Sequence, residues 1–277
     1  MKKAAEKETE LQILKVERGR MQVYIVGESP LILNRMSEKA KHMLLHPRGK
    51  LNAYEKQTNT KHNPREEFEG SAHRIKTGPT LLALPSTAFK GALSTAALDM
   101  PGTKKAQIAR LTYVEGEYVG IHGIPKVHMT WVKGADMNRT PDIRTRVIIP
   151  EWAGTFSVTY VVPLLAHNAV ANLIGASGVY IGVGDGRPEK GKLSFGRFRI
   201  VSPDDADYKR IVKYGGRKLQ ETAMKAAEPY DEETKELWGW WHDEVKRRNF
   251  EKTGQQRKAK PNGHIPEVED RQVEVNA

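Results

Sequence analysis

The fold is organised around the stretch Ile181-Gly-Val-Gly-Asp-Gly-Arg-Pro-Glu-Lys-Gly-Lys-Leu-Ser-Phe-Gly-Arg-Phe-Arg-Ile200. Its glycines alternate with arginine and lysine, and it ends in a strand-like aromatic pair, Phe195 and Phe198. Glycine lets backbone N–H groups approach a phosphate closely and the cations supply charge, so the combination favours an anionic polymer as ligand. The alternative is a long hairpin loop whose glycines only meet the geometry of turns.

Nucleotide-binding fingerprints do not fit this stretch. Gly182, Gly184 and Gly186 lack the later glycine of the Rossmann pattern, and no Lys-Ser/Thr pair of a P-loop follows. A strand, rather than a helix, is predicted next. We therefore expect no cofactor.

The composition favours an anionic partner. The chain has a formal net charge of +11 and a pI of about 9.6, which points to nucleic acid first and to an anionic membrane surface second. It has no cysteine, which excludes disulfides, cysteine-ligated zinc and a thiol nucleophile. No signal peptide and no apolar run of membrane-spanning length is recognised, so we expect a cytoplasmic protein without a membrane partner.

A strand and a helix are predicted over residues 81–98. Leu81-Leu-Ala-Leu is followed by a proline turn, a Ser/Thr cap and an amphipathic helix that buries Phe89, Leu93 and Ala96. Gly91 lowers the helix propensity by about 1 kcal/mol relative to alanine. It therefore indicates a close approach, either by a phosphate that Lys90 would also meet or by a neighbouring helix.

Two further strands are predicted over residues 143–149 and 155–162. The first alternates at period two, with Arg144 and Arg146 on one face and Thr145 and Val147 on the other. Two arginines on one strand face are candidates for gripping a nucleic-acid backbone. The alternative is an exposed edge whose charges prevent aggregation.

The order of elements predicts an α+β fold of the modified ferredoxin-like, or RRM, type with large loop insertions and a C-terminal helical extension. A second helix is expected over residues 164–176, and the return strand is expected to begin at Gly178. Strand, helix, two or more strands, helix and strand is the ferredoxin-like order. The predicted parts are a disordered N-terminus (1–10), an RRM-like core (11–202) with insertions at 46–80 and 122–150, a helical extension (203–250) and a disordered tail (251–277).

Three blocks resemble the RAMP superfamily, the RRM-like subunits of CRISPR effector complexes and their phage or mobile-element relatives. They are Leu84-Pro-Ser-Thr-Ala-Phe-Lys-Gly-Ala-Leu93, the stretch from Gly182 to Phe198, and Tyr24-Ile-Val-Gly-Glu-Ser-Pro-Leu-Ile-Leu33. The resemblance implies copies that stack into a helical backbone along single-stranded RNA, with Lys90 and Gly91 near the RNA beside the glycine-rich loop. It also implies an inserted hairpin, Val127 to Ile148, acting as a thumb between bases.

The leading hypothesis is a non-enzymatic protein that binds single-stranded nucleic acid, RNA rather than DNA, and oligomerises into a filament or effector backbone used in antiviral defence. Its partners would be the strand, further copies of itself and other effector subunits. Trp131, flanked by Lys133 and Arg139, is the preferred base-stacking residue. The predicted binding residues are Lys90, Gly91, Trp131, Lys133, Arg139, Arg144, Arg146, Gly184, Gly186, Arg187, Lys190, Lys192 and Arg197.

Three alternatives remain open from the sequence. One is a phage-type protein that binds or anneals single-stranded DNA in recombination. Another is a RAMP-like endoribonuclease, although Glu28 and Asn34 stand where the cleaving aspartate of that family is expected. Nuclease candidates are Asp136, Asp142, Asp185, His122 and His128, with Asp185 first, but no catalytic residue and no metal site is assigned. The third is an adaptor that docks through the tryptophan-bearing helix at 231–250.

Overall fold

The structure is a computed structural model of the 277-residue chain. It describes residues 14–36, 41, 44–45, 62–133 and 140–258. The predicted N-terminal segment 1–10, residues 46–61 of the first predicted insertion and residues 134–139 of the second lie outside the described residues. Two compact units are distinguished, Met1–Trp238 and Gly239–Ala277.

The main sheet has the ferredoxin-like strand order. Among the described residues its seven strands run β10-β1-β9-β6-β4-β3, with β5 also paired to β9. The order β10-β1-β9-β5 is antiparallel at every step, and β1 and β9 pair from Glu17↔Val162 to Val26↔Ala153. The predicted fold class is therefore confirmed. The strands are β1 (Glu17–Gly27), β3 (His73–Arg74), β4 (Leu82–Pro85), β5 (Thr112–Val114), β6 (Tyr118–His122), β9 (Ala153–Val162) and β10 (Phe198–Val201).

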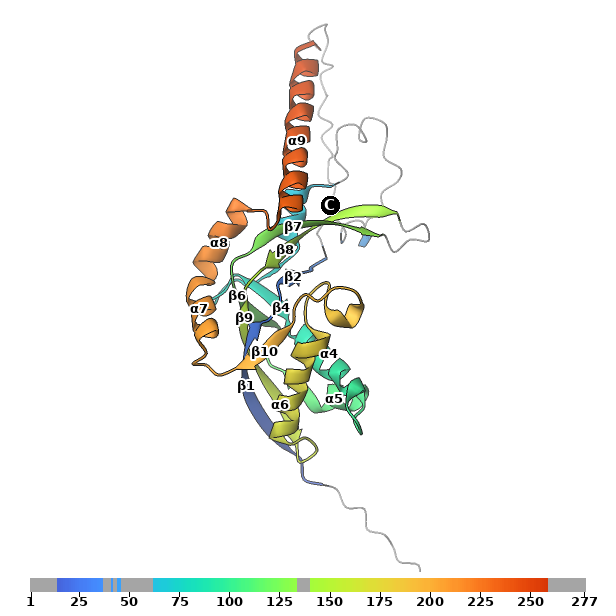
Figure 1. The fold of residues 1–277 in the computed structure, drawn as a ribbon, viewed down its shortest axis with the longest axis vertical. Helices are drawn as coiled ribbons and strands as arrows, with labels where there is room; N and C mark the ends of the chain where they lie inside the picture. Colours follow the sequence, from blue (N-terminus) through green and yellow to red (C-terminus); the bar gives the residue numbers. More distant parts are fainter. Residues whose placement is uncertain (1–13, 37–40, 42–43, 46–61, 134–139, 259–277) are drawn as a thin grey trace, which may run out of the picture. The chain divides into compact units, whose positions relative to one another are not determined.

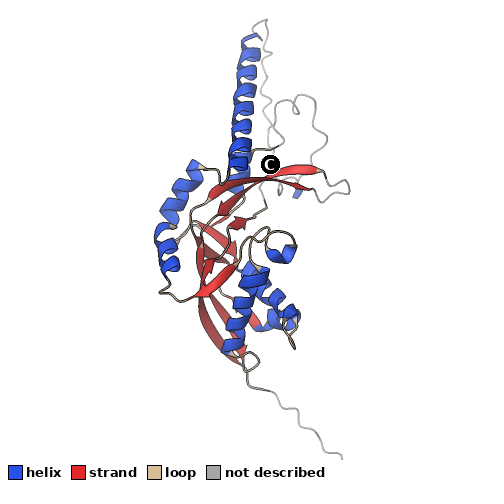
Figure 2. Ribbon diagram, viewed as in Figure 1, coloured by secondary structure: helices blue, strands red, loops and turns tan. Residues whose placement is uncertain are grey.

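Helices α4 (Ser86–Ala96) and α6 (His167–Ala176) cover one face of this sheet (Figures 1 and 2). As predicted, α4 buries Phe89, Leu93 and Ala96. The ring of Phe89 lies 4.7 Å from that of Phe156 and 6.1 Å from that of Phe198, measured between centroids. Burial of one such ring contributes about 1.5–3 kcal/mol, so these aromatic contacts hold α4 to β9 and β10.

The opposite face is covered in part by α7 (Ala206–Tyr214). Tyr208 packs edge-on against Tyr24 of β1, and its hydroxyl lies 2.6 Å from Thr155 Oγ1 of β9. Ile211 joins Val26 and Ala153 in a small second core. These contacts place α7 over one end of the sheet.

Helix α8 (Arg217–Ala226) is held by buried hydrogen bonds to strands β4 and β6 and the residues beside them. Gln220 is fully buried: its amide oxygen accepts from the N–H groups of Leu81 and Leu82, and its amide nitrogen donates to the carbonyls of Ile121 and Gly123. One side chain thus satisfies four backbone groups of strands β4 and β6 and their flanks.

A second, three-stranded sheet has the order β2-β8-β7. Its strands are β2 (Leu31–Leu33), β7 (Lys126–Lys133) and β8 (Pro141–Ile149), and β7 and β8 pair from Lys126↔Ile148 to Lys133↔Pro141. Val127 and Val147 at the base are buried, whereas Trp131 nearer the tip is 59% exposed. The hairpin predicted at 127–148 is therefore present, rooted in the core and exposed at its far end.

Short helices border the hairpin and α4. Helix α3 (Pro64–Gly70) lies beside β8. Ser71, directly after this helix, accepts a hydrogen bond at its Oγ from the Val147 N–H of β8 at 2.8 Å. This bond covers the edge of β8 beyond the end of β2. Helix α5 (Lys105–Leu111) follows α4 after a 3₁₀ turn at Ala97–Asp99.

The predicted return strand from Gly178 is wrong. Residues Ser177–Ile181 continue α6 as a π-helical turn, and the chain regains a strand only at β10. Gly178 lies so close to the carbonyl and ring of Phe198 that any side chain there would collide with them. Gly178 is thus required for packing between this turn and β10, not for a strand start.

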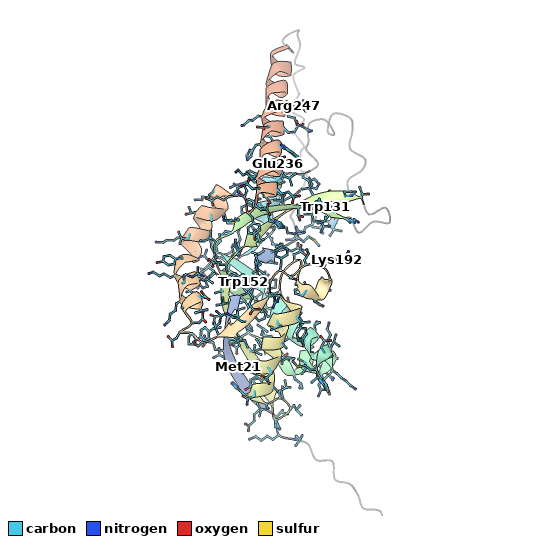
Figure 3. The ribbon with its side chains drawn as sticks, viewed as in Figure 1. Met21, Trp131, Trp152, Lys192, Glu236 and Arg247 are labelled. Atoms are coloured by element: carbon cyan, nitrogen blue, oxygen red, sulfur yellow. The ribbon has the colours of Figure 1, made fainter. Side chains whose placement is uncertain are left out.

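Two tryptophans illustrate the division between core and surface (Figure 3). Trp152, between β8 and β9, is fully buried, and its Nε1 donates to the Ser29 carbonyl at 2.8 Å. Trp131 lies on the exposed part of the hairpin. Only the second is available to a ligand.

Residues after α8 cover the outer edge of the hairpin base. The Val127 N–H donates to the Glu228 carbonyl and the Tyr230 N–H donates to the Val127 carbonyl, both at 2.8 Å. Thr234, fully buried, accepts from the Met129 N–H at 3.1 Å. This segment therefore pairs with the outer edge of β7, as a fourth strand of this sheet would.

Helix α9 (Glu232–Lys258) spans the boundary between the two units. In the first unit, Leu237 and Trp238 pack against the main core. In the second, Arg247 and Arg248 hydrogen-bond the Glu244 carboxylate and lower its pKa to about 2. The helix continues past residue 251, where the tail was predicted to begin.

Candidate nucleic-acid interface

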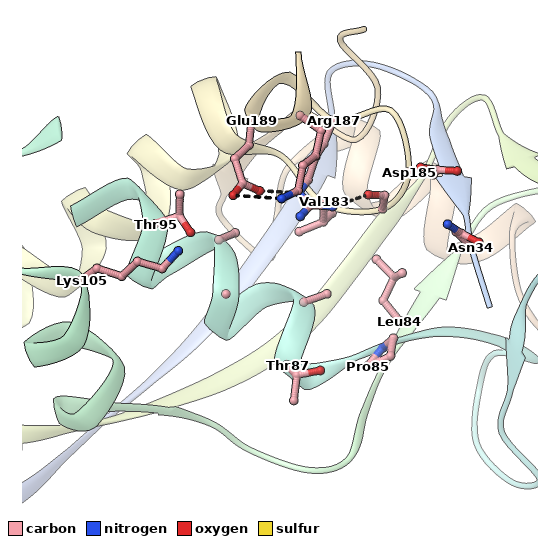
Figure 4. A pocket seen from close by; sticks show the side chains of 15 residues that line it. Asn34, Leu84, Pro85, Thr87, Thr95, Lys105, Val183, Asp185, Arg187 and Glu189 are labelled. Atoms are coloured by element: carbon pink, nitrogen blue, oxygen red, sulfur yellow. Dashed lines mark hydrogen bonds and ion pairs between the residues drawn. The ribbon is translucent and has the colours of Figure 1, made fainter. Parts of the chain in front are cut away.

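A pocket of about 460 Å³ lies between α4 and the glycine-rich loop, which we define as residues 182–196 (Figure 4). The sequence indicated α4 and this loop as separate candidates for ligand binding, nearly 100 residues apart, and the two segments line one cavity. The lining residues are Asn34, Leu84, Pro85, Thr87, Ala88, Gly91, Ala92, Thr95, Lys105, Val183, Gly184, Asp185, Arg187, Glu189 and Lys190. We call this cavity the groove.

The glycines of the loop are required first by the loop itself. Gly184 has φ +83°, and a Cβ there would lie 2.5 Å from the Ile32 carbonyl oxygen. Gly196 has φ +70°, and a Cβ there would collide with the Val183 carbonyl. Left-handed backbone and close approach both demand glycine. The turn-geometry alternative thus accounts for these positions, as it does for Gly186 at φ +64°, which packs against Phe195.

The loop is pinned to strand β2. The Asp185 N–H donates to the Ile32 carbonyl at 2.9 Å, and the Gly196 N–H donates to the Pro30 carbonyl at 2.8 Å. Arg187 is held from within, because its guanidinium donates to Glu189 at 2.8 Å and to the Gly184 carbonyl at 3.0 Å. The groove wall is therefore built before any ligand arrives.

Gly91 has a different role from the loop glycines. It sits within α4, is exposed, and a Cβ added to it would meet nothing within 4 Å. The alternative of a glycine needed for tight helix packing is therefore wrong. Its absent side chain leaves the groove open at the helix surface.

The first turn of α4 faces the groove with Thr87 and Ala88. Pro85 precedes the helix and no side chain caps its N-terminus. The positive end of the helix dipole therefore lies at the groove and adds to the attraction of an anion there.

The freest cations of the groove are Lys105 and Lys190. Among the residues that the structure describes, Lys105 has no carboxylate partner, and Figure 4 shows its ammonium group extending toward Thr95. Lys190 is 63% exposed, and its Nζ lies 3.8 Å from Glu189. Arg187 is already paired with Glu189, and Asp185 with Arg146, so neither pair adds net charge.

The predicted binding residues separate into groups. Gly91, Gly184, Arg187 and Lys190 line the groove. Arg146 reaches its rim through the 3.2 Å ion pair with Asp185. Lys90 and Gly186 adjoin lining residues, and Lys192 is exposed farther along the loop, as Figure 3 also shows.

Arg197 lies outside the groove. Its guanidinium donates to the Val179 carbonyl at 2.9 Å and to Glu28 at 3.2 Å, which anchors the end of the loop next to β10. Arg139 lies outside the described residues.

The hairpin presents its predicted contacts on two opposite faces. Trp131 pairs with Ile143 and Thr130 pairs with Arg144, and directly paired residues share a face. Trp131 and Lys133 are therefore on one face, and Arg144 and Arg146 on the other. The predicted alternation of Arg144 and Arg146 against buried Thr145 and Val147 is confirmed, but one ligand segment on a single face cannot contact all of these residues.

Sequence reasoning missed Lys105, Thr95 and Asn34 as groove residues. Lys105 is the first residue of the short helix α5, which the spacing of apolar residues in the sequence did not predict. Asn34 comes directly after β2. These hydroxyl, amide and ammonium groups reach the groove from separate elements. A pattern within one stretch of sequence does not reveal such convergence.

Two of the nuclease candidates, Asp185 and Asp142, are engaged in contacts with other side chains or the backbone. One Asp185 oxygen accepts from its neighbour Gly186 N–H at 3.1 Å and the other from Arg146 at 3.2 Å. His62 Nε2 lies 2.9 Å from Asp142. Burial lowers the pKa of both His122 and His128. Asp136 lies outside the described residues.

Within the described ranges, no three histidine or carboxylate side chains are grouped so that they could hold a metal ion. In the same ranges, no helix combines the length and apolar character that crossing a membrane needs.

The chain was compared with known proteins. No protein-family model and no curated protein matches it. Among solved structures it matches Cmr6 from Pyrococcus furiosus with 9% identity and a TM-score of 0.33, over 68% of this chain and all of Cmr6. It also matches a chain in a cryo-EM structure of the Type III-B Cmr-beta bound to cognate target RNA, with 10% identity and a TM-score of 0.33, over 67% of this chain and 59% of that one.

A TM-score of 0.33 is too low for either match to bear on fold or function, which rest on this chain's own residues.

Proposed function

We propose that this protein binds single-stranded nucleic acid, RNA in preference to DNA, with the sugar-phosphate backbone in the groove. The observation that carries the proposal is the convergence of Gly91, the first turn of α4 and the glycine-rich loop on one cavity whose freest charges are Lys105 and Lys190. A net charge of +11 supports the same class of ligand.

The groove offers the parts that a nucleotide backbone needs. A phosphate is attracted by Lys105, Lys190 and the N-terminus of α4, and the absence of a side chain at Gly91 allows it to approach the helix. Thr87, Thr95 and Asn34 supply hydroxyl and amide groups in the same cavity. Such groups can hydrogen-bond a ribose 2′-hydroxyl, which supports RNA over DNA.

Trp131 is the proposed base-stacking residue. Its exposed indole stands on the hairpin with Lys133 beyond it on the same face. Stacking of one base on such a ring contributes about 1–3 kcal/mol. Arg144 and Arg146, on the other face, would then meet a different part of the strand.

We further propose that copies assemble along one strand, into a filament or the backbone of an effector complex with other subunits, in the cytoplasm. The protein is proposed to hold the strand without cutting it, because the carboxylate of Asp185 is already engaged on both oxygens.

The test uses the full-length protein with labelled single-stranded RNA, single-stranded DNA and duplex of equal length. Anisotropy is expected to give the tightest binding for RNA, denaturing gels to recover intact strands, and electron microscopy to show regular filaments on strands long enough for several copies. Failure to bind any single strand at low salt would contradict the proposal. Tighter binding of DNA would favour a recombination protein, and shortened RNA an endoribonuclease.

Gly91 gives a prediction in which stability and binding change in opposite directions. Gly91→Ala is expected to raise the free energy of unfolding by about 0.5–1 kcal/mol, because the new Cβ meets open space and alanine favours a helix interior. Gly91→Leu is expected to remain folded but to weaken RNA binding roughly tenfold, which corresponds to the loss of one charge-assisted hydrogen bond in the filled groove.

Urea unfolding and anisotropy measure the two effects of the Gly91 variants. Thr222→Leu, at an exposed position of α8, is the control for adding an apolar side chain to a helix surface. Unchanged RNA affinity in Gly91→Leu would mean that the strand does not enter the groove.

A further inference from the structure

The main sheet has a face that the described helices leave partly open. Helices α4 and α6 lie on one side of the sheet, and α7 and α8 lie on the other, toward one end (Figure 1). On that second face, the cover by α7 reaches the row of Tyr24 and Thr155. Farther toward the start of β1, no described helix lies over the sheet. We call the uncovered part the open face.

The register of three strands defines the open face. Arg20 of β1 is paired with Thr159 of β9, which is paired with Tyr113 of β5. Gln22 and Ser157 form the adjacent row. Because directly opposed residues in an antiparallel sheet point to the same side, these five side chains share the open face.

Tyr113 is placed on this face by its neighbours. Thr112 and Val114 are buried toward α4, and the side chain between them must therefore point the other way. It is 57% exposed, so the core does not need its ring. An exposed aromatic ring on a sheet is a surface on which an unpaired base can stack.

Arg20 lies on the same face as this ring, with Thr159 of β9 between the two residues. Its guanidinium donates to both oxygens of Glu115 at 2.8 and 2.7 Å, and Thr159 Oγ1 donates to the same carboxylate at 2.8 Å. These bonds hold the pKa of Glu115 below its usual range. The ion pair between Arg20 and Glu115 holds both side chains in place, and it leaves little net charge on this face to attract a phosphate.

The chemistry of the open face favours a base over a protein partner. Besides Tyr113 on β5, its exposed groups are the guanidinium of Arg20 and the amide of Gln22 on β1. The half-buried hydroxyls of Ser157 and Thr159 lie on β9, between these two strands. A protein interface has an apolar centre, which this polar surface lacks. A flat aromatic ring suits the face of a nucleobase, and the amide and hydroxyl groups on the same surface suit its hydrogen-bonding edge.

We propose that the open face is a second nucleic-acid site, which binds unpaired bases by stacking on Tyr113 with hydrogen bonds to Gln22 and its neighbours. The groove holds phosphates through charge, whereas the open face recognises bases. The two sites lie on different sides of the sheet, so one protein molecule can hold two segments of strand. This site does not depend on the groove.

Photochemical cross-linking tests the proposal on the full-length protein. RNA containing 4-thiouridine is bound, irradiated and digested with trypsin, and the expected cross-link lies at Tyr113, in the peptide between Arg110 and Lys126. Tyr113→Ala is expected to remove this cross-link and to weaken the base-dependent part of the affinity by roughly 5- to 100-fold. Tyr113→Phe keeps the ring and is expected to retain that affinity.

Two controls separate this site from the groove. An abasic strand of the same length is expected to bind wild type and Tyr113→Ala equally, since it has no base to stack. Lys105→Gln with Lys190→Gln is expected to weaken the groove and leave the Tyr113 cross-link in place. Equal affinity of Tyr113→Ala and wild type for RNA, with no cross-link in this peptide, would overturn the proposal. So would loss of self-association without loss of RNA binding, because the face would then contact a second copy.

Discussion

Replacing Gln220 by leucine is expected to lower the free energy of unfolding by roughly 3–5 kcal/mol. The side chain is fully buried and completes four backbone hydrogen bonds, at 2.7 and 3.1 Å to the N–H groups of Leu81 and Leu82 and at 2.7 and 3.0 Å to the carbonyls of Ile121 and Gly123. Leucine has a similar size but leaves these groups unpaired, at about 1–3 kcal/mol for each one that stays dry.

Thermal and urea unfolding measure this effect. A loss of this size corresponds to a fall in melting temperature of about 10 °C for a domain of this length. Thr222→Leu, two positions along α8 and exposed, is the matched control and is expected to stay within about 0.5 kcal/mol of wild type. A Gln220→Leu variant as stable as wild type would mean that α8 is not held to the sheet by this side chain.

Neutralising the two freest cations of the groove, Lys105→Gln with Lys190→Gln, is expected to weaken single-strand binding roughly 25-fold at about 0.1 M salt. Each phosphate contact on a single strand contributes about 0.7 to the slope of log affinity against log salt, which is about a fivefold factor at this concentration. Anisotropy with labelled single-stranded RNA measures the change.

Lys218→Gln is the matched control for charge removal. Lys218 is exposed on α8, outside the groove lining, and carries the same charge. Its loss is expected to change the affinity by less than about fivefold. Equal losses in the control and in the groove variant would indicate general attraction by net charge, without a specific site.

The spacing of apolar residues correctly predicted the strands and helices that have one buried face and one exposed face. In β8, Arg144 and Arg146 alternate with Thr145 and Val147, and the structure buries the second pair. In α4, Phe89, Leu93 and Ala96 recur at helical spacing and are buried. Because each pattern lies within one stretch of chain, sequence periodicity is sufficient to detect it.

The π-helical turn after α6 could not be predicted in this way. The sequence order predicts that the return strand begins at Gly178, but glycine is required there because Phe198, twenty residues later, packs closely against it. The same limit applies to the glycine-rich loop. The need for glycine at positions 184 and 196 comes from carbonyl groups of Ile32 and Val183, of which the first belongs to a distant strand.

The candidate site was predictable in outline. Gly91 and the glycine-rich loop were each selected from local composition, and the fold brings them to one groove. Lys105 was missed, because a single lysine in a chain rich in lysine carries no signal. Trp131 and Arg144 lie on opposite faces of the hairpin because of the register between β7 and β8. The sequence of one strand does not give this register, since it depends on which residues the two strands pair.

The salt dependence of RNA affinity tests the central claim, that the groove holds the phosphates of a single strand, most directly. The slope of log affinity against log salt is measured for wild type, the Lys105→Gln/Lys190→Gln variant and Lys218→Gln. The groove variant is expected to have a slope smaller by about 1.4, that is about 0.7 for each lost contact, with the control unchanged. An unchanged slope in the groove variant would contradict the claim and place the strand elsewhere on the protein.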